Sequence, residues 1–110
     1  MGVLGDSQYT VTVEGREILQ DAKALDVIRL WSDLLRDHSG KAAARDLLTK
    51  DEFLAMQAQI QDRLQVKGKA LFFPLRVAVI GKPHGTDLAQ LVPLLPVQSL
   101  IRRAESSLQA

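Results

Sequence analysis

The sequence predicts an all-α protein, a compact cage of five to seven short helices. Apolar residues recur at helical spacing in several segments, and candidate caps stand at the ends of those segments. Only one segment alternates in the manner of a strand. The 110 residues suggest a single domain, and 46% hydrophobic against 25% charged residues suits a folded globular chain. Because aromatic residues make up only 5%, aliphatic side chains must build the core.

The N-terminal segment is expected to be extended. Residues 1–8 contain two glycines and no periodicity, which is typical of a disordered start or a cloning remnant, so we place the helical domain at residues 9–110. The stretch YTVTVEG alternates threonine with valine as a strand does, but the chain offers no second convincing strand to pair with it. We therefore predict an extended arm that leads into a short helix from Glu14 to Gln20.

Two longer amphipathic helices are predicted next. Ala22 to His38 carries leucine, isoleucine and tryptophan at helical spacing, and Gly40 stands where a glycine commonly ends a helix. The stretch KAAARDLL that follows favours a short helix or a structured loop. Thr49 and Glu52 have the spacing of a capping box, which starts a helix that runs to about Gln65. The apolar stripe of that helix consists of Phe53, Met56, Ile60 and Leu64.

Prolines and glycines set the boundaries of three shorter helices in the C-terminal part. Pro74 suits the first position of a helix, and Gly81 suits its end. Thr86 can cap the next helix, and Pro96 can start the last one. The predicted helices are Leu75 to Ile80, Asp87 to about Leu94, and Val97 to about Leu108.

Charge is distributed unevenly along the chain. Residues 1–62 hold seven basic against eleven acidic residues, whereas residues 63–110 hold seven against two. The formal net charge is therefore −4 in the first part and +5 in the second. Such asymmetry is typical of a surface that faces a polyanion, although a solvated face without a partner gives the same pattern.

No pattern of catalytic residues stands out. The absence of cysteine excludes a disulfide scaffold, a cysteine-containing zinc site and a thiol nucleophile, and it fits a reducing compartment. The common phosphate-loop, nucleophile-elbow and zinc-protease motifs are missing, and His38 and His84 lack partners at ligand spacing. No apolar stretch approaches the roughly 20 residues of a membrane helix, and we see no secretory leader. We expect a cytoplasmic protein that is not an enzyme and does not contact a membrane.

The stretch VKGKALFFPLRVAVIGKPHG combines the longest apolar run with a cluster of basic residues. Lys67 and Lys69 flank a glycine, so backbone and two ammonium groups can approach a phosphate closely. Arg76 emerges beside a phenylalanine, and a planar guanidinium next to aromatic surface suits an unstacked RNA base. The alternative interpretation is that the lysines are ordinary surface residues and that Arg76 pairs with an acid. The residues alone leave both interpretations open.

This stretch closely resembles the C-terminal anticodon-binding domain of bacterial glutamyl-tRNA synthetases. In that family a lysine-glycine-lysine motif precedes a PLRVALTG helix, a glycine-containing loop and a leucine-rich segment. The corresponding stretch here is VKGKALFFPLRVAVIGKPHGTDLAQLVPLL, and the resemblance extends from Tyr9 to Leu108. The chain departs from the pattern at Ile80, Thr86 and Pro96, where the family often has threonine, proline and glycine.

The resemblance implies a helical cage, as in class I synthetases, that binds tRNA and reads the anticodon of glutamate tRNA. It implies that Arg76 lies at the anticodon surface, that Lys67 and Lys69 hold phosphates, and that the loop after Gly81 packs around splayed bases. The RNA-binding residues predicted in this way are Lys67, Lys69, Arg76, Lys82, Pro83, His84, Gly85, Thr86 and Leu88.

The resemblance also implies what the chain lacks. The family binds ATP in a Rossmann-type catalytic domain, and nothing like its signatures is present. We therefore expect no catalytic residue, no metal and no cofactor, since ATP and magnesium would belong to the catalytic domain of the parent glutamate–tRNA ligase. The expected partners are tRNA and the remainder of a synthetase. The alternative is a stand-alone helical protein-interaction module that docks on a synthetase or another protein.

Overall fold

The computed structural model describes residues 9–40, 47–85 and 87–109. Within these ranges the chain forms six α-helices and one 3-10 helix, and its only β-type pairing is an isolated bridge between Leu47 and Pro96. This confirms the predicted all-α class. The elements are α1 (Val13–Ile18), α2 (Ala22–Ser39), α3 (Lys50–Leu64), α4 (Lys69–Ile80), α5 (Leu88–Leu91), the 3-10 helix η1 (Val92–Leu94) and α6 (Val97–Leu108).

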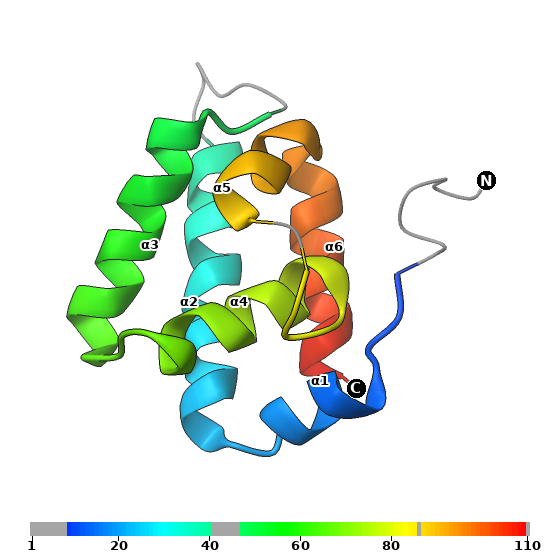
Figure 1. The fold of residues 1–110 in the computed structure, drawn as a ribbon. Helices are drawn as coiled ribbons and strands as arrows, with labels where there is room; N and C mark the ends of the chain where they lie inside the picture. The colour runs from blue at the N-terminus through cyan, green and yellow to red at the C-terminus, as the bar shows by residue number, and fades with distance from the viewer. Residues whose placement is uncertain (1–8, 41–46, 86, 110) are drawn as a thin grey trace.

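Helices α2 and α6 lie side by side and antiparallel, and α4 crosses both of them (Figure 1). Helix α3 packs along α2, while α5 and η1 pack against α3. The short helix α1 contacts α4 and lies at the same end of the molecule as the C-terminus (Figure 1). Helix α4 therefore stands at the centre of the arrangement, with neighbours on most of its sides.

The core forms where α2, α3, α4 and α6 meet. The rings of Trp31 and Phe53 make an edge-to-face contact, with centroids 5.7 Å apart and planes at 88°. Around this pair the buried side chains are mostly aliphatic, as the low aromatic content predicts. Fully buried members include Val27, Ile28, Leu35, Ile60, Leu71, Leu75, Val77 and Leu100.

Most predicted helix boundaries are confirmed. The capping box is present, since Thr49 Oγ1 accepts from the Glu52 amide at 3.1 Å and Glu52 Oε1 accepts from the Thr49 amide at 2.8 Å. Gly40 ends α2, but its φ of −79° shows that the left-handed conformation usual for such a glycine is not used. Helix α1 begins at Val13 and ends at Ile18, so it is shorter at its C-terminus than predicted.

The prediction that Pro74 starts a helix is wrong. Helix α4 begins at Lys69, and Pro74 lies inside it. The proline ring removes one backbone hydrogen bond, to the carbonyl of Ala70, but it is itself buried. Leu71, in the preceding turn, is fully buried. Burial of the turn before the proline thus outweighs the local preference for ending a helix there.

The predicted helix after the loop is also divided. Asp87 caps α5, its Oδ1 accepting from the Ala89 amide at 3.1 Å, while Thr86 lies outside the described residues. After Leu91 the chain continues as 3-10 helix, because Pro93 has no N–H with which to extend the α-helical pattern. The last helix begins directly after Pro96, as predicted.

The N-terminal arm, defined as residues 9–12, is extended and is not part of a sheet. This confirms the choice of an arm over a strand. Residues 1–8 and most of the KAAARDLL stretch lie outside the described residues, so those two predictions stay open. In the ranges that the structure covers, no helix is both long enough and apolar enough to cross a membrane.

Candidate nucleic-acid interface

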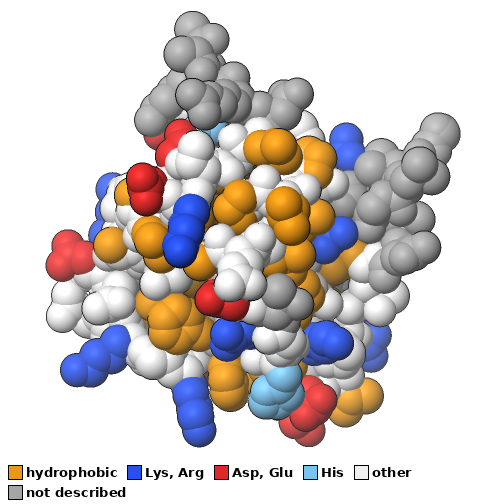
Figure 2. All heavy atoms as spheres, turned by 45° about the horizontal axis from the view of Figure 1, so that its top comes forward, with side chains coloured by type: hydrophobic (Ala, Val, Ile, Leu, Met, Phe, Trp, Pro, Cys, Tyr) orange, Lys and Arg blue, Asp and Glu red, His pale blue; other side chains and the backbone are white. Residues whose placement is uncertain are grey.

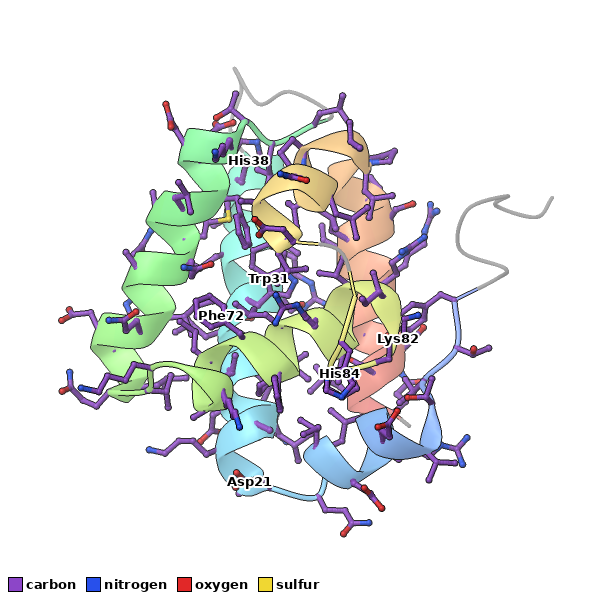
Figure 3. All side chains as sticks on the ribbon, in the orientation of Figure 1. Asp21, Trp31, His38, Phe72, Lys82 and His84 are labelled. Carbon is purple, nitrogen blue, oxygen red and sulfur yellow. The ribbon has the colours of Figure 1, made fainter. Side chains whose placement is uncertain are left out.

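Helix α4 carries Arg76 and lies between two other groups of predicted RNA-binding residues. Lys67 and Lys69 stand at its N-terminus, whereas Lys82 to Gly85 form the loop beyond its C-terminus. The helix has 12 residues, so its ends are about 18 Å apart at 1.5 Å per residue. Figure 3 shows Lys82 and His84 in that loop, while Phe72 points from α4 toward α3. The predicted residues therefore follow α4 as a line.

The middle of this line faces a hollow of about 380 Å³, hereafter the α4 hollow. Its walls come from α3, α4, the loop and the start of α5. The residues that line it are Gln57, Phe72, Arg76, Gly85, Asp87 and Leu88. Three of them, Arg76, Gly85 and Leu88, belong to the predicted set, so the fold brings these together.

The lining of the α4 hollow suits an unstacked nucleobase. Phe72 and Leu88 supply apolar surface for a flat ring. Arg76 offers N–H donors, the carboxylate of Asp87 offers acceptors, and the Gln57 amide offers both. Proteins that recognise single-stranded RNA combine these two features, stacking on a base face and hydrogen bonding along its edge.

Arg76 is half-buried and has no ion pair within the described part of the chain. Its Nε is buried and has no hydrogen-bond partner there. The interpretation that Arg76 is neutralised by an acid is therefore not supported. A partly desolvated cation without a counter-ion lowers the free energy of any anion or acceptor that enters beside it.

The N-terminus of α4 is open to an anion. Gly68 is the N-cap, supplies no side-chain cap, and is followed by no acidic residue in the first turn. The first backbone amides of α4 can therefore donate to a negative group. Lys67 and Lys69 are exposed on either side of Gly68. Lys69 also borders a cleft of about 330 Å³ that contains Glu17 and Asp21, which weakens the positive potential on that side.

The loop of residues 82–85 presents Lys82 and His84 to solvent, whereas Pro83 is buried. His84 Nε2 lies 3.8 Å from Glu14 Oε2, and the ring of His84 meets Phe73 edge-on at 5.7 Å. The side chain of Pro83 fixes the shape of the loop and is not on its surface. Thr86 lies outside the described residues, so its predicted contact with RNA stays a prediction.

His38 belongs to a different region. It is buried at the end of α2, and its Nδ1 lies 3.7 Å from Glu52 Oε2. Figure 3 places it near the start of α3, away from Lys82 and His84. Across residues 9–40, 47–85 and 87–109, no group of three or more His, Asp or Glu residues could hold a metal ion.

Basic and hydrophobic side chains are interleaved on the molecular surface. Figure 2 shows Lys and Arg side chains scattered around exposed hydrophobic ones, with few acidic side chains among them on the lower part of that face. A surface of this kind can meet phosphates and bases at the same time. It differs from a continuous positively charged surface, which is typical of proteins that bind the phosphate backbone of a duplex.

The predicted RNA-binding set omits three residues of the α4 hollow, Gln57, Phe72 and Asp87. Gln57 follows Phe53 by four positions and precedes Ile60 by three, so it borders the apolar stripe of α3 and could have been found. Phe72 precedes Arg76 by one helical turn, and the sequence did indicate a phenylalanine beside Arg76 without including it among the RNA-binding residues. Asp87 gave no comparable signal, because the adjacent threonine was a reasonable cap.

Comparison with known proteins places the chain in a family. The family model described as "Anticodon binding domain" matches residues 16–108. A Glutamate--tRNA ligase of Bdellovibrio bacteriovorus is 43% identical over 105 residues, which cover 96% of this chain and 20% of that protein. Glutamate--tRNA ligases of Bacillus licheniformis and Geobacillus stearothermophilus are 32% and 35% identical over 94% and 87% of the chain.

The chain spans about a fifth of the length of these curated relatives. No solved structure matches it. The family match covers nearly all described residues, including α4 and the loop that follows it. The chain therefore belongs to the anticodon-binding domain family, as its resemblance to the anticodon-binding domain of glutamyl-tRNA synthetases predicted.

Proposed function

We propose that this chain binds glutamate tRNA by its anticodon and has no catalytic site of its own. The observation that carries the proposal is the α4 hollow, in which Arg76, Phe72 and Leu88 meet in a member of the anticodon-binding domain family. Recognition requires an unpaired base to leave its stack and enter a site of matching shape. The α4 hollow is such a site.

Affinity and base choice are assigned to different parts of the line along α4. Lys67 and Lys69 attract backbone phosphates, which are the same in every tRNA. Arg76 and Asp87 face the base edge and distinguish its donors from its acceptors. Lys82 and His84 extend the surface on the other side of the loop. The basic residues of the line, Lys67, Lys69, Arg76 and Lys82, imply about four phosphate contacts at most, and thus micromolar or weaker binding at physiological salt.

The wider role follows from the relatives. They are named Glutamate--tRNA ligases, and the chain matches about a fifth of each. We infer that the chain is part of such a ligase, or derived from one, and works in the cytoplasm. Binding of the anticodon would help to place the acceptor end in the active site. ATP and magnesium would bind to the catalytic domain, and this chain would hold no cofactor.

A titration tests the proposal. The purified chain is titrated at low salt with glutamate tRNA and with the same tRNA carrying replaced anticodon bases. We expect tighter binding to the native anticodon. Equal binding to both would leave only a non-specific basic surface, and no binding to either would contradict RNA recognition by this chain.

A second candidate function is docking on a protein partner. It is favoured by the side chains of Leu94 and Val13, which are 73% and 74% exposed. Salt dependence separates the two functions. RNA binding weakens steeply as salt rises because counterions are released, whereas an apolar protein contact does not.

A further inference from the structure

The C-terminal end of α4 is held by the N-terminal arm, which is 68 or more residues away in sequence. The Tyr9 hydroxyl donates to the carbonyl of Val77 at 2.5 Å. The Thr12 amide donates to the carbonyl of Gly81 at 2.8 Å, and its hydroxyl donates to the same oxygen at 3.2 Å. The Val77 carbonyl also accepts from the Gly81 amide at 2.9 Å, so Tyr9 is its second donor, whereas both Thr12 donors meet the carbonyl of Gly81, the residue that caps the helix.

Helix α6 contributes a third attachment. Arg103 Nη1 donates to the carbonyl of Val79 at 2.7 Å. The guanidinium of the same residue lies 5.6 Å from the centre of the Tyr9 ring, a cation–π contact. Figure 1 shows the arm and α6 meeting at this end of α4. Arg103 thus connects the arm, α4 and α6.

The backbones at this end are in direct contact. A Cβ atom on Gly81 would lie 1.8 Å from the carbonyl oxygen of Thr10, and one on Gly15 would lie 2.6 Å from the carbonyl oxygen of Gly81. Two glycines therefore allow the arm and α1 to pack against the point where α4 ends. No side chain separates them, so a shift of the arm would be transmitted directly to Gly81.

Gly81 is also where the loop of residues 82–85 departs from α4. At its other end the chain re-enters the core through Leu88, which is 3% exposed and lines the α4 hollow. Between these points Pro83 is buried. The loop therefore has three attachments, and the first, at Gly81, combines the capping hydrogen bond of the Gly81 amide to Val77 with the contacts made by the arm and by Arg103.

We propose that Tyr9, Thr12 and Arg103 are positioning residues for anticodon recognition: they fix the loop of residues 82–85 in the shape that completes the α4 hollow. The inference rests on the proposed function and extends it to a segment that lies outside the hollow. The arm then determines how well bases are distinguished, while phosphate attraction at the other end of α4 is independent of it.

The chemistry of Tyr9 supports this role. Burial raises the pKa of its hydroxyl to about 12, against an opposing hydrogen bond with Ser107 and the nearby charge of Arg103. The hydroxyl is therefore protonated throughout the physiological range and remains a donor to Val77. The attachment does not weaken with any ordinary change of pH.

The test uses the full chain and two matched pairs of variants. Tyr9→Phe removes the hydroxyl donor and keeps the ring beneath the guanidinium. Arg103→Met removes the donor to Val79, and Arg102→Met is its control, because it removes the same charge from an exposed neighbour on α6. Arg103→Lys restores a charged donor at the same position.

Two quantities are measured for each variant. The first is hydrogen exchange at the amides of Gly81, Lys82, His84 and Gly85 in the free protein, which needs no RNA. The second is a discrimination ratio measured with two RNA hairpins. It is the Kd of the hairpin with replaced anticodon bases divided by the Kd of the hairpin with the glutamate anticodon loop. We expect faster exchange and a roughly threefold to tenfold smaller ratio for Tyr9→Phe and Arg103→Met, the effect of one lost hydrogen bond. Arg102→Met should leave both unchanged, and Arg103→Lys should restore part of each.

The possible failures are distinguishable. If wild-type protein does not distinguish the two hairpins, the proposed function is wrong and this inference falls with it. If wild-type protein distinguishes them and the Tyr9 and Arg103 variants do so equally well, with only a lower melting temperature, the attachments serve stability alone and the positioning role is wrong.

Discussion

The two ends of α4 both carry a glycine with positive φ, but they differ in their contacts with the rest of the chain and in their charge. Each is marked by a glycine with positive φ, 62° at Gly68 and 84° at Gly81. A Cβ atom on Gly68 would have no neighbour within 4 Å among the described residues, and the adjacent lysines are exposed. Around Gly81 the arm and α1 are in backbone contact, and Arg103 holds the turn before it. One end is open and charged, and the other is fastened.

This difference indicates that the two ends of α4 have different roles in RNA binding. Attraction to phosphate needs positive charge and tolerates movement, because the Coulomb interaction has no sharp directional requirement. Discrimination between bases needs donors and acceptors at fixed places, so it requires a rigid support. The open end of α4 is suited to affinity and the fastened end to specificity.

The largest expected effect is on stability, from adding a methyl group at each glycine. Gly81→Ala should lower the free energy of unfolding by about 3 kcal/mol or more, because backbone strain is combined with a clash against Thr10. Gly68→Ala should cost about 1–3 kcal/mol from strain alone, because its φ of 62° and ψ of −135° lie in a region that residues with a side chain rarely adopt. Urea unfolding measures both.

Gly40→Ala is the matched control for these two variants. Gly40 has a φ of −79°, and a Cβ there would meet only ordinary contacts at 3.5 Å. Its effect should stay within about 0.5 kcal/mol of zero. Equal losses at Gly68 and Gly81 would mean that the contact with the arm carries no energy, which would remove the contrast between the two ends.

Arg76→Ala is expected to act on binding and not on the fold. It should weaken binding to the native anticodon by about 1–3 kcal/mol, while the free energy of unfolding changes by less than about 1 kcal/mol. The reason is that Arg76 makes no ion pair among the described residues. Calorimetric titration and thermal melting give the two values, with Arg63→Ala as a control for charge on an exposed helix position.

A sharp fall in melting temperature, with unchanged binding per folded molecule, would show that Arg76 is structural. The middle of α4 would then belong to the scaffold and would have no part in base choice.

The fastened end should also show a dependence on alkaline pH. The pKa of Tyr9 is raised to about 12 in the folded chain, against about 10 when unfolded, so the folded state binds the proton more tightly. Stability from this group is fully present below pH 10 and is lost as pH rises toward 12. The loss should be at most about 2 kcal/mol, since Tyr9 is only partly buried.

Tyr9 is the sole tyrosine, so tyrosinate absorbance reports its titration directly. Tyr9→Phe should remove this part of the pH dependence of unfolding, although lysines still titrate in the same range. Ionisation of the folded protein with a midpoint near pH 10 would contradict the partial burial of the Tyr9 hydroxyl.

The smallest effect is expected at the open end. Lys67→Ala should weaken binding to native and replaced anticodons alike, by less than about 1 kcal/mol, and lower the salt slope by about one unit or less. Binding titrations at several salt concentrations measure both. A loss confined to the native anticodon would give Lys67 a role in base choice and contradict the proposed difference in roles.

Local signals in the sequence were sufficient for much of the fold. The capping box at Thr49 and the apolar spacing of α2 and α6 act within a few residues, so they are readable without tertiary structure. The prediction that Pro74 starts a helix was wrong because the local preference of proline competes with burial of the preceding turn. That burial depends on packing of α4 against α2 and α6. The same limit applies to the site: Arg76 was readable, but its neighbours Gln57 and Asp87 come from other elements.

The sequence by itself determined the helical class, the caps, the basic character of the C-terminal part and the family. All of these depend on residue types and on spacings along the chain. Only the tertiary structure decided that Arg76, Gly85 and Leu88 share one hollow, and that Tyr9 and Arg103 hold the end of α4. The physical reason is that a contact across 24 or 68 residues leaves no periodic trace in a sequence. It arises when packing of the core brings distant segments to the same place.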